Sequence, residues 1–159
     1  MIWYRERAAW RFVVLRYVPW IAGLSLVWEI AHTPLYTLWR EADAAYIAFS
    51  IAHCTVGDVL IAAAALALAL AVAREGAPAE WRWRRLAAST TALAVAYTAF
   101  SEWMNVTLLR SWSYAEAMPK LELGEFELGL TPLLQWLLLP SLALYLGRKT
   151  GRPRLTSPA

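Results

Sequence analysis

Seven polar side chains interrupt the apolar stretches of this sequence, and they are of the types that carry out acid–base or metal chemistry. They are Glu29, His32, His53, Asp58, Glu102, Asn105 and Gln135. An acidic residue costs about 2.5–3.5 kcal/mol at the centre of a bilayer on insertion scales, so such groups persist only with partners or with a function. These seven residues are therefore the candidates for a functional site.

Four apolar stretches contain these residues, near Tyr17–Tyr36, Ala44–Ala73, Leu86–Leu109 and Leu128–Gly147. Each has the ~20 residues that a helix needs to cross a bilayer. Hydrophobic residues make up 60% of the 159-residue chain and charged residues 17%, which is more apolar surface than a soluble domain of this size can bury. The sequence predicts an all-α integral membrane protein, with residues 1–147 forming one bundle of four transmembrane helices.

Basic residues predict the orientation of this bundle. Twelve of the 15 Lys and Arg residues lie in the N-terminal segment, in the loop between the second and third spans, or after the fourth span. Because cytoplasmic segments are the ones enriched in Lys and Arg, both termini are predicted to be cytoplasmic, in a plasma (inner) membrane. Topology thus explains the net charge of +3 without a nucleic-acid partner. Residues 148–159 are predicted to form a basic, disordered cytoplasmic tail.

This topology brings the seven polar residues to one depth, in the extracytoplasmic half of the membrane. Spans one and three run outward and carry their polar residues late, whereas spans two and four run inward and carry theirs early. Five ionisable groups at one level must satisfy one another, a ligand or a metal. The alternative is a hydrogen-bond network that only fixes helix packing.

The spacing of these residues favours a metal site. Glu29 and His32 share a helix face because they are three residues apart, and Glu102 and Asn105 repeat this spacing. The pattern resembles part of the carboxylate-bridged di-metal bundles, in which Glu-x-x-His motifs on two helices join Glu residues of the other two. Asn105 stands where that family has a second His, so a single zinc or non-haem iron ion fits better. Its predicted ligands are Glu29, His32, His53 and Glu102.

Proton transfer is the other chemistry that these side chains support. Asp58, Glu102 and Asn105 are the predicted catalytic residues, with or without a metal. A haem held axially by His32 and His53 is less favoured, because three buried acids make a poor haem pocket.

The loop 110–131 follows the third span and would lie over the cluster. Its segment Leu121–Leu128 alternates apolar and acidic residues around a Gly-Glu pair, which predicts a short β-hairpin. The loop is interpreted as a cover, with Trp112 and Tyr114 at its rim. These two aromatic residues and Gln135 are the predicted substrate contacts.

These features favour a small membrane enzyme over the other classes. The predicted substrate is a membrane lipid or isoprenoid, and the reaction a hydrolysis, an oxidation or a proton-transfer isomerisation or cyclisation. The alternatives are a single-haem electron-transfer subunit and a non-catalytic assembly subunit. A homo-oligomer or a larger membrane complex is compatible with all three, whereas transport by four short helices would require an oligomer.

Overall fold

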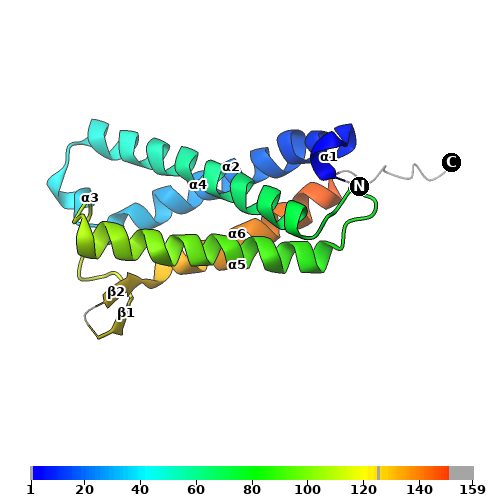
Figure 1. Cartoon of the computed structure of the whole chain (residues 1–159). Helices are drawn as coiled ribbons and strands as arrows, with labels where there is room; N and C mark the ends of the chain where they lie inside the picture. Colours follow the sequence, from blue (N-terminus) through cyan, green and yellow to red (C-terminus); the bar gives the residue numbers. More distant parts are fainter. Residues whose placement is uncertain (1, 125, 151–159) are drawn as a thin grey trace, which may run out of the picture.

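The computed structural model describes residues 2–124 and 126–150, and its dominant feature is a bundle of four long helices (Figure 1). Neighbouring helices pack in the cyclic order α2, α4, α5, α6, and α6 returns to α2, which closes the bundle. The four helices are α2 (Val18–His32), α4 (Ala44–Val72), α5 (Trp83–Glu102) and α6 (Leu130–Lys149).

Helix α2 is the middle of a longer helical segment, Arg7–Leu35. The segment begins as α1 (Arg7–Phe12), passes through a π-helical turn η2 (Val13–Tyr17) and ends in a 3₁₀ turn η3 (Thr33–Leu35), while a separate 3₁₀ turn, η1 (Trp3–Arg5), precedes it. The π-turn lies just before Pro19, which has no N–H to continue the regular helical ladder.

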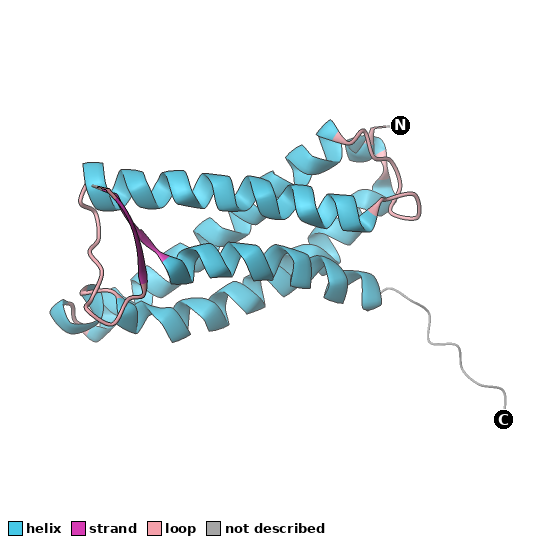
Figure 2. Cartoon of the chain, turned by 90° about the horizontal axis from the view of Figure 1, so that it is seen from below, coloured by secondary structure: helices cyan, strands magenta, loops and turns pink. Residues whose placement is uncertain are grey.

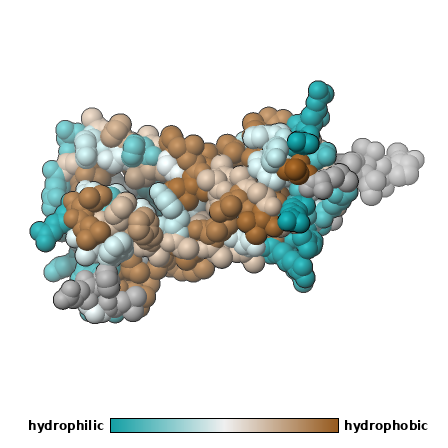
Figure 3. All heavy atoms as spheres, in the orientation of Figure 1, coloured by the Kyte–Doolittle hydropathy of each residue, from teal (hydrophilic) through white to brown (hydrophobic). Residues whose placement is uncertain are grey.

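In the described part of the chain, three helical segments are long and apolar enough to cross a membrane: Arg7–Leu35, Ala44–Val72 and Leu130–Lys149. Figure 3 shows the corresponding apolar belt between two hydrophilic ends. The third predicted span lies in α5, which is less apolar because it starts at an Arg pair and carries several Ser and Thr residues. Three of the four predicted spans are therefore supported by length and composition, and α5 packs beside them between α4 and α6.

Helix α4 is bounded by clear capping interactions. The side chain of Asp43 accepts a hydrogen bond from the backbone N–H of Tyr46 at 2.8 Å, a standard N-cap. At the other end Arg74 adopts a left-handed conformation, with φ of 51°, and the N–H of Glu75 bonds back to the carbonyl of Leu70 at 3.0 Å. This Schellman-type ending turns the chain towards α5.

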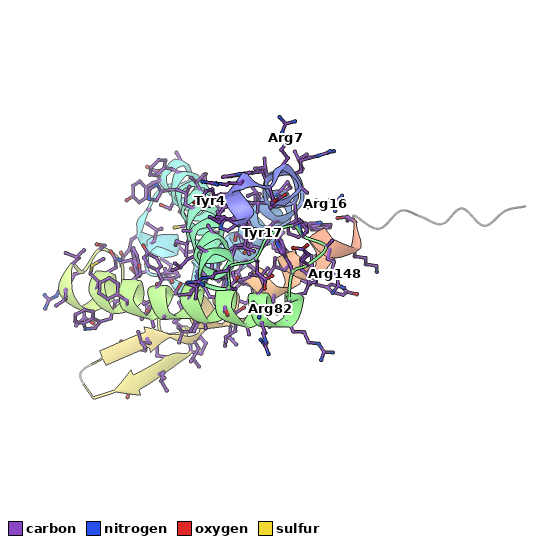
Figure 4. All side chains as sticks on the ribbon, turned by 45° about the vertical axis from the view of Figure 1, so that its right-hand side comes forward. Tyr4, Arg7, Arg16, Tyr17, Arg82 and Arg148 are labelled. Atoms are coloured by element: carbon purple, nitrogen blue, oxygen red, sulfur yellow. The ribbon has the colours of Figure 1, made fainter. Side chains whose placement is uncertain are left out.

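One end of the bundle is basic, and we call it the basic end. Figure 4 shows Arg7, Arg16, Arg82 and Arg148 gathered there, where α1, the start of α5 and the end of α6 meet. An aromatic cluster holds these elements together: Phe12 packs edge-on against Trp81 and Trp83, each at 5.2 Å between ring centroids, and Arg148 lies over Trp83. Arg148 and Lys149 of the predicted tail belong to the last turn of α6, and residues 151–159 lie outside the described residues.

The opposite end, which we call the hairpin end, carries the short helix α3 (Leu38–Glu41) and a two-stranded antiparallel hairpin (Figures 1 and 2). Strand β1 (Lys120–Leu123) pairs with β2 (Phe126–Gly129), with Lys120 opposite Gly129 and Leu123 opposite Phe126. The predicted hairpin is confirmed. Its second strand leads directly into α6, so β2 replaces the predicted first residues of the fourth span.

Candidate functional site

Four buried side chains that end in a carboxyl or amide group lie within the hairpin half of the bundle, one from each long helix. Glu29, Asp58, Glu102 and Gln135 are 6%, 8%, 6% and 3% exposed, respectively. We call these four residues the carboxyl cluster. The cluster holds four of the seven sequence candidates, and a fifth, His32, is also buried.

Regular spacing explains why these side chains face inward. On α2 the buried residues are Ile21, Ser25, Glu29 and His32, and on α5 they are Leu86, Thr90, Ala94, Thr98 and Glu102. Positions three or four residues apart fall on one face of a helix. Glu29 and Glu102 therefore lie late in inward-facing rows, and each has a hydroxyl residue one turn before it.

The contacts of Asp58 join three helices. Gln135 Nε2 donates a hydrogen bond to Asp58 Oδ2 at 2.5 Å, which connects α6 to α4. Glu29 on α2 is hydrogen-bonded to Asp58 and also contacts Gln135. Two carboxyl groups and one amide thus meet at the centre of the cluster.

Glu102 contacts the loop that covers the hairpin end. The Tyr114 hydroxyl donates a hydrogen bond to Glu102 Oε2 and accepts one from the backbone N–H of Gly129 at 3.0 Å. The indole of Trp112 lies beside the same carboxylate. A Cβ on Gly129 would come within 3.1–3.2 Å of the Tyr114 ring and of Pro132, so glycine lets the phenol lie against the start of α6.

Two loops form the cover. The N–H of Thr37 bonds to the carbonyl of Ser113 at 3.0 Å and that of Ala115 to the carbonyl of Leu35 at 2.9 Å, so Tyr36 pairs with Tyr114 in a β-bridge. Burial, and then the charge of Glu102, raise the pKa of both phenols. Tyr114 therefore stays protonated at neutral pH and remains a donor to Glu102.

His32 lies at the edge of the cluster. Its Nδ1 is 3.3 Å from the carbonyl oxygen of Trp28 and 3.9 Å from Glu29 Oε1. Because a carbonyl only accepts, Nδ1 carries the hydrogen of that bond and Nε2 is left as the acceptor. The ring also contacts Tyr36, at 5.3 Å between centroids, which links the cluster to the cover.

Two sequence candidates are not part of the cluster. His53 is exposed on α4 and stacks on Phe49 at 5.7 Å, so the structure does not bring it to Glu29, His32 and Glu102. Asn105 lies in a second π-helical turn, η4 (Trp103–Leu108), where its amide donates back to Ser101 of the preceding turn. Its hydrogen bonds are therefore local to its own helix.

The predicted metal-ligand set is correspondingly incomplete. Within residues 2–124 and 126–150, no three His, Cys, Asp or Glu side chains are arranged so that they could hold one metal ion. The displacement of His53 removes one predicted ligand, and Asp58 turns towards Gln135 and Glu29. The exposed position of His53 also bears on the haem alternative, because His32, the other predicted axial ligand, is buried. The structure does not bring the two histidines together.

Sequence reasoning placed Ser25 one turn before Glu29, as a hydrogen-bonding residue of the bundle, but missed Thr98. Ser25 lies beside Asp58, yet its Oγ has no partner at hydrogen-bonding distance and angle, and the same is true of Thr98 Oγ1, one turn before Glu102. The signal for Thr98 was the four-residue spacing Leu86, Thr90, Ala94, Thr98 and Glu102.

Comparison of the chain with protein-family models, with curated proteins and with solved structures gave no match. The fold and the site define a helical-bundle protein with three helical segments long and apolar enough to cross a membrane and a buried carboxyl cluster under a two-loop cover.

Proposed function

We propose that this protein is a small membrane enzyme that transfers protons to or from a lipid or isoprenoid substrate, with the carboxyl cluster as its acid and base. The proposal favours the metal-free version of the sequence prediction, because the cluster presents carboxyl groups in contact with one another. The proposed reaction is an isomerisation or cyclisation at an apolar carbon skeleton.

The observation that carries the proposal is the burial of three carboxyl groups without a cation. Glu29 interacts electrostatically with both Asp58 and Glu102. The ion pairs of the described residues bring no Lys or Arg to any of the three. Such an arrangement opposes folding, and chains retain it at sites where a carboxyl group must exchange a proton.

The contacts suggest a division of roles. Glu29 and Asp58 share a proton, because two carboxyl groups in contact do not both ionise, and Gln135 fixes the ionised oxygen of Asp58. Glu102 accepts from Tyr114, which links it to the cover. In the proposed reaction Asp58 removes a proton from one carbon of the substrate, and the proton held by Glu29 is supplied at a second carbon. The Glu102 carboxylate stabilises the positive charge that develops on the carbon skeleton.

Solvent isotope exchange tests this proposal without knowledge of the substrate. Purified protein in liposomes of bacterial lipid extract, incubated in D₂O, should introduce deuterium into one lipid or isoprenoid species, detected by mass spectrometry. Asp58→Asn and Glu102→Gln should each lower the exchange rate about 100-fold or more, within the usual range for a lost base and for a lost stabilising charge, respectively.

Glu122→Gln, on the exposed hairpin, is the matched control and should exchange at the wild-type rate. A mass change other than deuterium uptake would point to hydrolysis or oxidation in place of proton transfer. An unchanged lipid profile in the folded wild-type protein would contradict the enzyme proposal.

We further propose that the basic end faces the cytoplasm and that the carboxyl cluster lies in the extracytoplasmic half of a plasma (inner) membrane, with α5 as a fourth span. The support is the separation of charge along the bundle, since Arg7, Arg16, Arg82 and Arg148 gather at one end (Figure 4). Cytoplasmic ends of membrane proteins are the basic ones.

Thiol labelling tests this orientation. In a Cys54→Ala background, cysteine at exposed Glu41 or Glu122 should react with an impermeant maleimide added to intact cells. Cysteine at Glu80, in the loop between α4 and α5, should react only after lysis. The reverse pattern would place the cluster in the cytoplasmic half.

A second function, that of a non-catalytic assembly subunit, is favoured by a specific observation. Each carboxyl group of the cluster has a hydrogen-bond partner: Gln135 and Glu29 for Asp58, and Tyr114 for Glu102. The fixed packing of the four helices would be a sufficient role for a network of this kind. Measurements of the stability of variants at Glu29 separate the two functions.

A further inference from the structure

We propose that the carboxyl cluster binds an amphiphile with an ammonium headgroup, so that the substrate brings the positive charge that the cluster lacks. This inference rests on the proposed function, because both treat the carboxyl cluster as the site where a ligand binds. The new element is the chemical class of that ligand. Four features of the site support it.

The first feature is charge. Glu29, Asp58 and Glu102 are all buried, and at most part of their combined charge is removed by the proton that Glu29 and Asp58 share. His32 brings no fixed positive charge, because its neutral ring already satisfies the Trp28 carbonyl through Nδ1–H and needs no second proton to do so. A cation that entered the cluster would gain Coulomb energy in a medium of low dielectric constant, where such interactions are strong.

The second feature is a pair of buried hydroxyl groups whose oxygen lone pairs can turn towards a cation. Ser25 and Thr98 are 1% and 6% exposed, and neither hydroxyl has a partner at hydrogen-bonding geometry. Each lies one turn before a carboxylate, on the same inward face of its helix. Buried polar groups without partners are uncommon, and Ser25 also lies beside Asp58, at the centre of the carboxyl cluster.

The third feature is a row of aromatic rings beside the carboxylates. His32, Tyr36 and Tyr114 contact one another in succession, at 5.3 and 5.6 Å between centroids. Tyr36 interacts electrostatically with both Glu29 and Glu102. Aromatic faces combined with carboxylates are the usual recognition elements for ammonium groups, including quaternary ones.

The fourth feature is the surrounding apolar surface, which selects an amphiphile over a water-soluble amine. The helices that hold the cluster expose large apolar side chains at the same level, among them Ile30 on α2, Val56 and Leu60 on α4 and Leu134 on α6. A ligand with an acyl or prenyl chain could place that chain along this surface while its headgroup enters between the helices.

Binding of dodecyltrimethylammonium to the whole protein in maltoside micelles tests the inference. Intrinsic tryptophan fluorescence is a suitable signal, because Trp112 lies beside Glu102. The matched probe is dodecyldimethylamine oxide, which has the same chain and a headgroup of similar size without net charge. Tetramethylammonium tests the headgroup without its chain.

We expect saturable binding of the ammonium amphiphile, at least tenfold tighter than that of the amine oxide or of tetramethylammonium. Glu102→Gln should weaken it at least tenfold, and Glu122→Gln should leave it unchanged. The preference should persist at about 0.3 M salt, since buried charges are screened far less than exposed ones. Equal affinity for the two amphiphiles, or for wild type and Glu102→Gln, would overturn the inference.

The two proposals fail independently. Selective ammonium binding without isotope exchange would preserve the ligand class and contradict the enzyme proposal. Isotope exchange on a lipid without an ammonium group, together with equal binding of the two amphiphiles, would preserve the enzyme proposal and overturn the ligand class.

Discussion

Replacing Tyr114 with phenylalanine is expected to lower the free energy of unfolding by about 2–4 kcal/mol, although it removes a single oxygen atom. That oxygen donates to Glu102 and accepts from the backbone N–H of Gly129. The phenylalanine ring would leave a buried carboxylate and a backbone donor without their partner, and each such loss typically costs about 1–3 kcal/mol. The two-loop cover would also lose its bond to α5.

Unfolding in mixed detergent micelles measures this effect. Tyr145→Phe, which removes a hydroxyl from an exposed side chain of α6, is the control and should change stability by less than about 0.5 kcal/mol. In a double-mutant cycle with Glu102→Leu, the combined loss should be smaller than the sum of the single losses, because both changes remove the same bond. An additive cycle would show that Tyr114 and Glu102 do not depend on each other.

Element positions were the part of this structure that the sequence predicted well. The second predicted span, Ala44–Ala73, corresponds to α4 at Ala44–Val72, and the predicted hairpin is present. Both follow from strong local signals: a long apolar run without breakers, and alternation of apolar and acidic residues around a Gly. The third span was predicted like the others, but α5 is not among the segments apolar enough to cross a membrane, because its Arg, Ser and Thr residues lower its hydropathy.

The rotation of α4 could not be predicted, and this explains the misplacement of His53. Helix α4 is rich in Ala and Leu on every side. One side packs against other helices, and the exposed side is part of the apolar belt on the surface of the bundle. A helix in such surroundings has little amphipathic contrast, so periodicity does not show which side faces inward. Asp58 lies on the inward-facing side of α4. His53, five residues earlier, lies on the exposed side.

The bond between Tyr114 and Glu102 was also beyond sequence reasoning. Spacing rules apply within helices and strands, whereas Tyr114 lies in an irregular loop whose path is set by pairing with residues 35–37. The sequence placed Tyr114 near the site as a rim residue. Only the fold shows that Gly129 leaves room for its ring and that its hydroxyl connects the cover to α5.

Glu29→Gln is expected to stabilise the protein, by about 1–3 kcal/mol, and at the same time to reduce isotope exchange about 100-fold. The wild-type carboxyl group lies against Asp58 and near Glu102, so the pair must hold a proton at a pH where a free carboxyl group would lose it. A neutral amide at this position removes that cost. The new NH₂ group can also donate to Asp58. Replacement of buried charged groups by neutral ones is often stabilising, and active sites commonly sacrifice stability in this way.

Glu75→Gln provides the matched comparison, because Glu75 is equally buried but is paired with Arg82 at 2.9 Å at the basic end of the bundle. Neutralising Glu75 removes a favourable ion pair, so this variant should be less stable than wild type. Opposite signs for the two substitutions would mark Glu29 as a residue retained for chemistry. If Glu29→Gln destabilises the protein as Glu75→Gln does, the carboxyl cluster holds the helices together, and the assembly-subunit function replaces the enzymatic one.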